Sequence, residues 1–448
     1  MQVQERHGVD DVVENDRRYV LHSWSTQSQI APLPIAGAQG CYFWDYAGKR
    51  YLDFNSQLMN SNLGHQHPRV VAAIQEQAGK LCYIAPGFAN DKRGELAHLL
   101  SEITPGNLRM SFFANGGADA NENAIKMARA YTGRHKIISR YRSYHGATMG
   151  AMTLTGDPRR WPSEPGIPGV VRVLDPYSYR CSFCRPGSCS LHCADHIAEV
   201  IEYEGPNTIA AMIMETVTGT NGIIVPPPGY LKRVREILTH YGILMIADEV
   251  MCGFGRTGKW FAVDHWDVVP DIITVAKGIN SGYVPLGAAV VSEPIAEWFN
   301  DHMFWGGLTY SGHPLACAAA IASIETYRDE HVIENSAAMG MIVRASLDEM
   351  AQRHPSIGEV RGLGCFWAIE LVKNRETREP LVPFNAGGSA MAPINALLKR
   401  GMELGLFLNA HWNIVMVNPP LIITEAELRS GLAILDECLT IADQAMAG

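Results

Sequence analysis

Apolar runs alternate with stretches in which apolar residues recur every three or four positions through the middle of this chain. Strands buried on both faces are apolar throughout, and the helices that cover them are amphipathic. The pattern predicts an α/β fold with a mostly parallel sheet covered on both faces. Strands are predicted over 110–114, 135–141, 208–214, 242–247, 271–276 and 286–291, and helices over 119–131 and 230–241.

The two ends of the chain have a different pattern. Residues 41–54 predict two short strands around the turn at Ala47-Gly48, followed by helices from Pro68 and over 91–103. After residue 330 helices dominate among scattered strands, and the last helix is predicted over 425–446. We therefore expect a large domain over 61–330 and a smaller α+β domain from both chain ends, 1–60 and 331–448.

Composition limits the partners of this chain. The net charge is −9 and no basic run reaches five residues, so neither nucleic acid nor an anionic membrane surface is expected to bind. The first 16 residues are acidic and contain no apolar run, and no stretch of 18 apolar residues follows, so neither a secretory signal nor a membrane span is predicted. Ten cysteines in 448 residues are too few for a disulfide scaffold, which favours a cytoplasmic location.

Chemically distinctive residues follow the predicted strands. Lys277 follows the strand at 271–276, Asp248 follows the strand at 242–247, and residues 115–118 (NGGA) join a strand to a helix. Taken singly, these are more often a solvated lysine, a turn cap and a plain loop. Ligands of open parallel sheets bind outside the carboxyl ends of the strands. A Schiff-base lysine, an acid for a pyridine nitrogen and a phosphate-binding turn together predict pyridoxal 5′-phosphate.

Two further motifs bear on the binding of a cofactor ring. Tyr144 and His145 follow the strand-like run at 135–141, and one of them would stack on the cofactor, although aromatic residues after strands are mostly core. Residues 253–258 (GFGRTG) match the dinucleotide fingerprint G-x-G-x-x-G. That fingerprint requires a helix directly after its glycines, whereas here a proline-containing stretch without helical periodicity follows. Nicotinamide or flavin binding is therefore not predicted.

Taken together, these motifs resemble the class III (omega) aminotransferases, a family of fold-type I pyridoxal-phosphate enzymes. The resemblance extends over nearly the whole chain and is closest to taurine and ω-amino-acid transaminases. It rests on the phosphate turn at 115–120, YHG at 144–146, ADEVMCGFGRTGKWF at 247–261, AKG at 276–278, GLTYSGHPLACAAA at 307–320, EVRGLG at 359–364 and PPL at 419–421.

The resemblance implies roles for the matching residues. Lys277 would bind the cofactor aldehyde as a Schiff base and move the proton, and Asp248 would pair with the pyridine nitrogen. Tyr144 and Val250 would cover opposite faces of the ring, with Glu215 near its hydroxyl side. The implied reaction moves the amino group of a terminal (ω) amine, such as taurine or an ω-amino acid, to a 2-oxo acid such as pyruvate or 2-oxoglutarate.

The resemblance also implies a shared phosphate site. Backbone groups at Gly116, Gly117 and Ala118 would bind the phosphate, and Thr309 would reach it from the partner subunit of a homodimer. Relatives commonly have Ser-Gly-Ser/Thr-Glu at 116–119 and Glu-Pro at 215–216, where this chain has GGAD and Glu-Thr. Two hydroxyl groups are therefore missing, and phosphate binding would depend on the backbone and Thr309.

The residue that binds the substrate anion departs from the pattern of many relatives. Those enzymes place a mobile arginine about ten residues before the Pro-Pro of the C-terminal strand, where this chain has Asn409. Because residues 401–420 contain no arginine, the hypothesis is a fixed cation elsewhere: Arg142, Arg159 or Arg160. The alternative is that these arginines form only surface ion pairs. With a fixed cation, small ω-amino acids and aminosulfonates would be better donors than bulky apolar amines.

Other interpretations remain open at this point. The same cofactor site could support lyase, decarboxylase or aminomutase chemistry, which consumption of a 2-oxo acid would distinguish. Cys181, Cys184, Cys189 and Cys193 are spaced C-x₂-C-x₄-C-x₃-C, which could hold zinc, form a disulfide or remain reduced. Structural zinc sites usually separate two pairs by a longer loop, so reduced thiols are favoured and no metal site is predicted.

Overall fold

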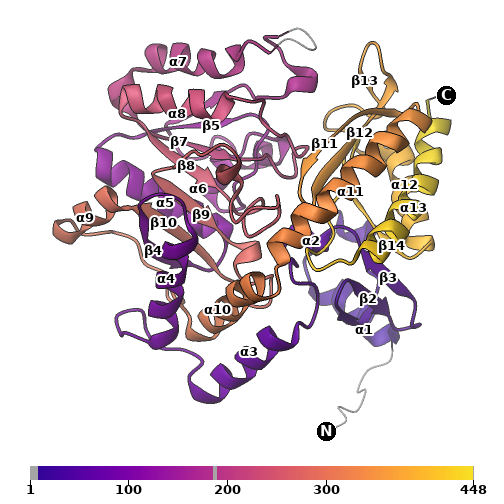
Figure 1. Cartoon of the computed structure of the whole chain (residues 1–448), viewed down its shortest axis with the longest axis horizontal. Helices are drawn as coiled ribbons and strands as arrows, with labels where there is room; N and C mark the ends of the chain where they lie inside the picture. Colours follow the sequence, from indigo (N-terminus) through magenta and orange to yellow (C-terminus); the bar gives the residue numbers. More distant parts are fainter. Residues whose placement is uncertain (1–8, 185–188, 447–448) are drawn as a thin grey trace.

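The computed structural model describes residues 9–184 and 189–446, and its largest sheet has seven strands in the order β4-β10-β9-β8-β7-β5-β6 (Figure 1). Strands β6, β5, β7, β8 and β9 run parallel, while β10 is antiparallel to both β4 and β9. The predicted mostly parallel sheet is confirmed. The strands are β4 (Leu108–Ala114), β5 (Lys136–Arg140), β6 (Val170–Val173), β7 (Ile209–Glu215), β8 (Leu244–Asp248), β9 (Ile272–Val275) and β10 (Gly287–Ser292).

Helices cover both faces of this sheet, which explains why its strands are apolar throughout. Along β7, Met212 and Met214 pack in one core with α7 (His192–Glu204) and α8 (Tyr230–Tyr241). Ala211 and Ile213, which alternate with these methionines along the strand, pack in the opposite core. The helices of that second core are α5 (Gly117–Thr132) and α9 (Glu293–Asp301), and the short α6 (Met149–Leu154) contributes Leu154.

Three helices form a layer beside β4, and the last of them, α10, is followed by the C-terminal elements. Helix α10 packs against α3 and α4, and its alanine-rich sequence allows the three to approach closely. The predicted helix over 91–103 is confirmed. The three helices are α3 (Pro68–Lys80), α4 (Asp91–Ile103) and α10 (Pro314–Asp329).

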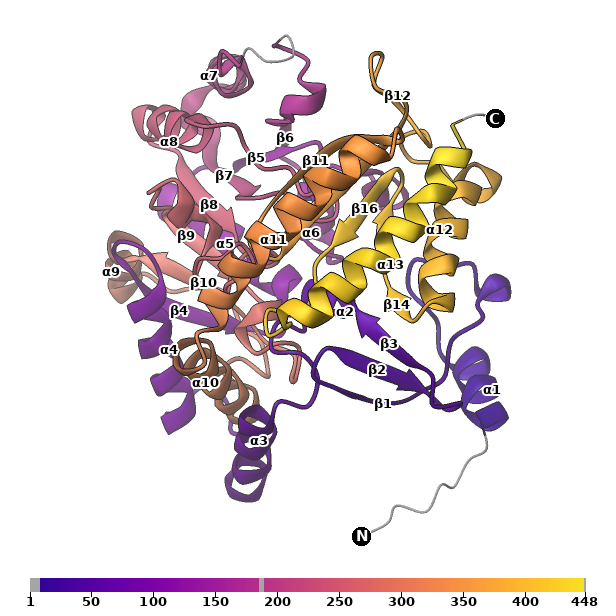
Figure 2. The same cartoon turned by 45° about the vertical axis from the view of Figure 1, so that its right-hand side comes forward.

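A second sheet lies under the C-terminal helices (Figure 2). Its path is β11-β12-β16-β15, with β13 (Glu379–Pro380) paired to β12. Helices α11 and α13 contact one another over this sheet, and α12 packs against α13. The elements are α11 (Val332–Arg353), β11 (Ile357–Leu363), β12 (Phe366–Asn374), α12 (Ala392–Glu403), β15 (Asn409–His411), β16 (Ile414–Val417) and α13 (Glu425–Gln444).

A third sheet joins the two ends of the chain. The strand order in this sheet is β1-β2-β3-β14. Strands β1, β2 and β3 are antiparallel neighbours, and β14 (Leu406–Phe407) pairs in parallel with β3. Lys49 Nζ donates to Glu403 O across 354 positions of sequence, which ties the same two ends together. The division into domains over 1–60, 61–330 and 331–448 stays a prediction. The N-terminal elements are α1 (Val9–Tyr19), β1 (Ile35–Gln39), β2 (Tyr42–Asp45), β3 (Arg50–Asp53) and α2 (Ser56–Met59).

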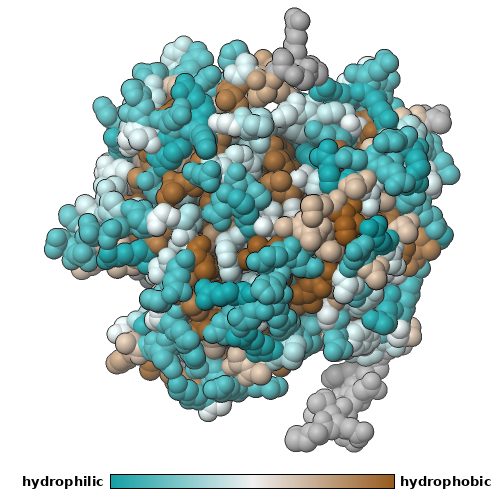
Figure 3. Space-filling view, viewed as in Figure 1, coloured by the Kyte–Doolittle hydropathy of each residue, from teal (hydrophilic) through white to brown (hydrophobic). Residues whose placement is uncertain are grey.

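The surface is largely polar on the face drawn in Figure 3, with apolar residues gathered toward its middle. Across residues 9–184 and 189–446, no helix is both long and apolar enough to span a membrane.

Candidate active site

A cavity of about 420 Å³ opens at the carboxyl edge of the seven-stranded sheet. The register places Glu215 of β7 beside Asp248 of β8, and Asp248 beside Thr274 of β9. Lys277 follows two residues after β9. Three strand ends therefore bring distant positions to one wall, as expected for an open parallel sheet. Nine of the ten predicted site residues line this cavity: Gly116, Gly117, Ala118, Tyr144, His145, Glu215, Asp248, Val250 and Lys277.

Lys277 is held in an unusual environment. Its backbone φ is 43°, in the left-handed region that costs a non-glycine residue free energy and is found most often at functional sites. Burial lowers the pKa of the amine and nearby Arg159 acts in the same direction, whereas Asp248 and Glu215 raise it. The amine has no hydrogen bond or ion pair to the rest of the described chain. A buried amine whose pKa is lowered is suited to attack a carbonyl carbon.

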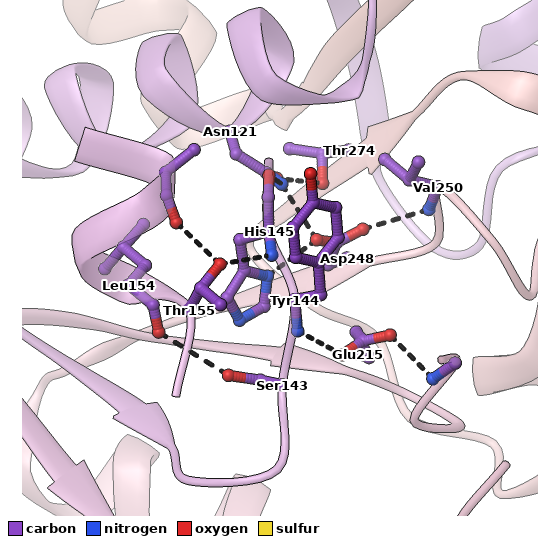
Figure 4. A network of polar contacts seen from close by, with 12 residues as sticks. Asn121, Ser143, Tyr144, His145, Leu154, Thr155, Glu215, Asp248, Val250 and Thr274 are labelled. Atoms are coloured by element: carbon purple, nitrogen blue, oxygen red, sulfur yellow. Dashed lines mark hydrogen bonds and ion pairs between the residues drawn. The ribbon is translucent and has the colours of Figure 1, made fainter. Parts of the chain in front are cut away.

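Asp248 is buried and held from three sides (Figure 4). Its Oδ2 accepts from Asn121 Nδ2 at 2.8 Å and lies 2.7 Å from His145 Nδ1. Its Oδ1 accepts from the backbone N–H of Val250 at 3.0 Å. Its orientation is therefore fixed by groups from three different segments.

Glu215 is a second buried carboxyl at this edge. Burial raises the pKa of Glu215, and the neighbouring Asp248 acts in the same direction. Its two oxygens accept from the backbone N–H groups of Tyr144 at 3.0 Å and Gly219 at 2.6 Å. Glu215 thereby holds the segment that presents the Tyr144 ring to the cavity (Figure 4).

The start of α5 forms a narrow anion cradle. A side chain at Gly117 would meet Val250 Cγ1 at 2.8 Å, and one at Gly146 would meet Ala118 Cβ at 2.4 Å. Gly146 also has φ +135°, which favours glycine. The first N–H groups of a helix have no partner within it and carry partial positive charge, so this end is suited to a phosphate. The two glycines keep the approach open.

One cation lies over the aromatic wall of the cavity. The guanidinium of Arg159 is 3.9 Å from the centroid of the Tyr144 ring and 5.6 Å from that of Trp24. Nε donates to Asp157 Oδ2 at 2.8 Å, and Nη2 donates to Thr220 Oγ1 at 2.8 Å. Within the described ranges Nη1 has no hydrogen-bond partner, so its N–H groups are available to a ligand.

The other two candidate arginines face elsewhere. The guanidinium of Arg142 is 5.1 Å and 5.0 Å from the ring centroids of Tyr177 and Phe384, and it lines a separate cavity. Arg160 Nε donates to Glu164 at 2.9 Å. At the position of the mobile arginine of many relatives, Asn409 Oδ1 accepts from the N–H of Ala410. Of the predicted cations, Arg159 is therefore the one directed at Tyr144.

Thr309 does not line the cavity of its own chain. It is exposed before α10, and its carbonyl accepts from Tyr83 Oη at 3.0 Å. The role of Thr309 toward a second subunit stays a prediction.

Sequence reasoning missed two residues of this region. Asn121 is fully buried and contacts Asp248. The sequence could have revealed Asn121, because it is a polar residue on the apolar face of α5, three and four positions before Ala124 and Ile125. Trp24, whose ring centroid is 6.3 Å from that of Tyr144, lies in a polar N-terminal stretch that offered no pattern.

The cysteine-rich segment forms a different cavity, of about 570 Å³, lined by Cys181, Cys184, Cys189 and Cys193. All four thiols are free. Over the described ranges, no group of three or more histidine, cysteine or acidic side chains is placed to hold a metal ion. Residues 185–188, inside the predicted cysteine motif, lie outside the described residues. The absence of a metal site at these cysteines stays a prediction.

Comparison with known proteins gives one consistent result. A family model described as aminotransferase class-III matches residues 24–439. A probable aminotransferase of Mycobacterium tuberculosis is 38% identical over 442 residues, 95% of this chain and 93% of the relative. The taurine–pyruvate aminotransferase of Bilophila wadsworthia is 34% identical over 451 residues, 97% and 98% of the two chains.

A solved structure gives the same result at the level of the fold. It is the taurine:2-oxoglutarate aminotransferase from Bifidobacterium kashiwanohense, in complex with pyridoxal phosphate and glutamate. The match has a TM-score of 0.93 and 44% identity, and it covers 97% of this chain and 98% of that chain. The fold-type I prediction is confirmed, and amino-group transfer is favoured over the lyase, decarboxylase and aminomutase alternatives.

Proposed function

This chain belongs to the class III aminotransferases, which depend on pyridoxal 5′-phosphate, and we propose that it takes the amino group from small amines that carry an acidic group. Taurine and short ω-amino acids are the proposed donors, and pyruvate or 2-oxoglutarate is the proposed acceptor. The observation that carries this proposal is the free edge of the Arg159 guanidinium, next to Tyr144 at the cavity.

The cavity fits the cofactor that the family requires. The cradle at Gly117 and Ala118 suits its phosphate, the buried Lys277 amine suits its aldehyde, and the Asp248 carboxylate suits a protonated ring nitrogen. Tyr144 and Val250 are the proposed contacts for the two ring faces, and Glu215 and His145 complete the set. When bound, the cofactor ring withdraws electrons from the carbon that bears the amine.

The chain's own residues then supply four actions. Lys277 would take the proton from the donor carbon and hand it to the bound cofactor, because its buried amine lies at the cavity wall without a hydrogen bond to the described chain. Asp248 keeps the ring nitrogen protonated. Tyr144 would limit access of water to one side of the site, and Arg159 would orient the acidic end of the substrate. In the net reaction the donor would become a carbonyl compound, and its amino group would pass to the 2-oxo acid.

Arg159 matches the hypothesis of a fixed cation. Its guanidinium is held by Asp157 and Thr220, while Nη1 stays available for a carboxylate or sulfonate. A hydrogen bond from a charged donor is about twice as strong as one from a neutral donor, so an amide such as that of Asn409 cannot bind the substrate anion as strongly as a guanidinium. A cation that does not swing away leaves an unpaired charge beside a bulky apolar donor, which disfavours that donor.

The substrate proposal is tested by exchanging Arg159 for glutamine. Arg159→Gln should lower kcat/KM for taurine and β-alanine by about 10²-fold, the loss typical of truncating one partner of a buried charge pair. The value for 1-phenylethylamine should change little or rise. Arg160→Gln, one position away and directed at Glu164, is the matched control and should leave both donors unchanged. Equal catalytic efficiency of the wild type with 1-phenylethylamine and with taurine or β-alanine would contradict the proposal.

A homodimer with shared sites is part of the proposal. Thr309 is exposed, and large apolar side chains near it are exposed as well: Met303, Trp305 and Tyr310 are 67%, 83% and 56% exposed. Clustered exposed apolar residues mark surfaces that another chain covers. A second copy that covers this surface would bring its Thr309 hydroxyl to the phosphate cradle. The ten free thiols support a cytoplasmic location, which cell fractionation would test.

A further inference from the structure

A polar side chain with no role in the proposed reaction lies beneath the acid of the site. Asn121 of α5 is 0% exposed, and its side chain connects the end of β8, the end of β9 and the loop that contains His145 (Figure 4). Its Nδ2 donates to Asp248 Oδ2 at 2.8 Å and to the backbone carbonyl of His145 at 2.8 Å. Thr274 Oγ1 donates to Asn121 Oδ1 at 2.7 Å.

The direction of these hydrogen bonds is fixed by the groups themselves. A backbone carbonyl can only accept, so the amide nitrogen of Asn121 must face His145 O. The same nitrogen then faces Asp248, and the amide oxygen must face Thr274, whose hydroxyl donates. Asp248 Oδ2 therefore meets an N–H donor from Asn121, and it lies 2.7 Å from His145 Nδ1. An ionised carboxylate accepts from the Asn121 N–H group, whereas a proton on Oδ2 would face that group.

Asn121 also connects two walls of the cavity. Through Asp248 it reaches the wall proposed for the ring nitrogen, and through the carbonyl of His145 it holds the segment that carries Tyr144. That segment is fixed on its other side, where the N–H of His145 donates to Thr155 Oγ1 at 2.9 Å. Rotation of the Asn121 amide would leave the His145 carbonyl and Asp248 without this donor, at a cost typical of unsatisfied buried groups.

We propose that Asn121, with its amide oriented by Thr274, is a positioning residue that holds the Asp248 carboxylate directed at the cofactor ring nitrogen. This inference rests on the proposed role of Asp248. It assigns the direction of a hydrogen-bond relay, Thr274 to Asn121 to Asp248, in which each member restricts the next. Thr274 is paired with Asp248 across the sheet, so strand register places the first and last members side by side.

The test compares two probes that differ at one ring atom. Pyridoxal 5′-phosphate and its 1-deaza analogue both carry the aldehyde and the phosphate, but the analogue has carbon in place of the ring nitrogen. Dissociation constants of both are measured by absorbance titration of the cofactor-free full-length protein. Contributions of Lys277 and the α5 cradle cancel in the ratio of the two constants, which reports the interaction at the ring nitrogen.

The wild type should bind pyridoxal 5′-phosphate more tightly than the analogue. Asn121→Asp is nearly isosteric but replaces the donor by an acceptor, so it should reduce that preference by about tenfold or more, the range of a hydrogen bond to a charged group. Thr274→Val removes the group that orients the Asn121 amide, so it should reduce the preference for pyridoxal 5′-phosphate by about threefold. Thr274→Ser keeps the hydroxyl and should show the wild-type preference. Substitution of a residue that only supports the fold would weaken the binding of both probes equally.

Asp248→Asn, measured in parallel, separates the two proposals. If it abolishes the preference while Asn121→Asp and Thr274→Val retain the wild-type ratio, the relay is wrong and the role of Asp248 stands. If Asp248→Asn itself retains the preference, both are overturned. Should Asn121→Asp fail to fold, the contrast between Thr274→Val and Thr274→Ser decides, because equal ratios in those two variants contradict the relay.

Discussion

The cavity beside Lys277 and the cavity beside the cysteines differ in how reactive side chains reach them. Around Lys277, residues come from separate elements that meet at one sheet edge, and Asp248, Glu215 and Arg159 are each held by hydrogen bonds. The four cysteines instead come from one short stretch of sequence. Burial raises the pKa of the Cys193 thiol to about 12, while a hydrogen bond from Ser190 lowers that of Cys184. Convergence of distant, oriented groups distinguishes the first cavity from a merely local concentration of thiols.

The largest effect should come from removing the base of the first cavity. Lys277→Ala should lower turnover beyond the roughly 10⁴-fold upper range of one acid–base group, because anchoring and proton transfer are lost together. Lys399→Ala, at an exposed position of α12, is the control. The purified wild type should be yellow, and borohydride should fix the cofactor to Lys277, as read by peptide mass spectrometry. Labelling of another lysine would overturn the assignment.

Asp248→Asn should come next in size. A neutral amide does not hold a proton on the ring nitrogen, so activity should fall by about 10²-fold or more, the range seen for one preorganised electrostatic group. Circular dichroism should show an unchanged fold. Near-native kcat would mean that the Asp248 carboxylate is only structural. The orientation of this group would then no longer distinguish the cavity at Lys277 from the cavity at the cysteines.

Shared sites should appear in mixed dimers of two defective chains. Thr309→Ala should weaken cofactor binding by about tenfold, through loss of one hydrogen bond to a charged group. Mixed with Lys277→Ala chains, it should regain activity, because both defects fall in one site of each mixed dimer and the second site is intact. Native mass spectrometry establishes that mixed dimers form. Their presence without any gain in activity would contradict a shared site.

The smallest effect should come from the cysteines. The double variant Cys184→Ser/Cys189→Ser should keep activity within about twofold and unfolding free energy within about 0.5 kcal/mol, because neither side chain is buried and serine can still hydrogen-bond Ser190. Treatment of the wild type with a chelator should change neither quantity. Stoichiometric zinc by elemental analysis, or a large loss on chelation, would make the second cavity a metal site.

Much of the sheet could be predicted because burial leaves a simple pattern. The buried strands β7, β8, β9 and β10 begin and end within two residues of their predicted bounds, and α8 coincides with its prediction. The direction of β10 could not be predicted, because an apolar run reports burial on both faces and not orientation. Strand β1 was missed because its half-exposed residues, IAGAQ, carry little alternation.

The site was predictable where strand ends impose proximity. Lys277 and Asp248 directly follow apolar runs, so position alone brought them to one edge. The separation of Arg159 from Arg160 was not predictable, because adjacent residues in the turn at Pro158–Ser163 diverge according to local partners, Thr220 for one and Glu164 for the other. Asn121 escaped notice because its importance depends on a partner 127 positions away.

The pairing of β3 with β14 has a consequence for synthesis on the ribosome. When residues 50–53 leave the exit tunnel, their partner at Leu406–Phe407 has not been translated, and at 5–20 residues per second it follows roughly half a minute later. During that interval, the edge of β3 and apolar residues such as Tyr51 and Leu52 lack their final cover. A nascent chain of this protein therefore carries an open strand edge until nearly its end, which makes it a candidate for early chaperone binding.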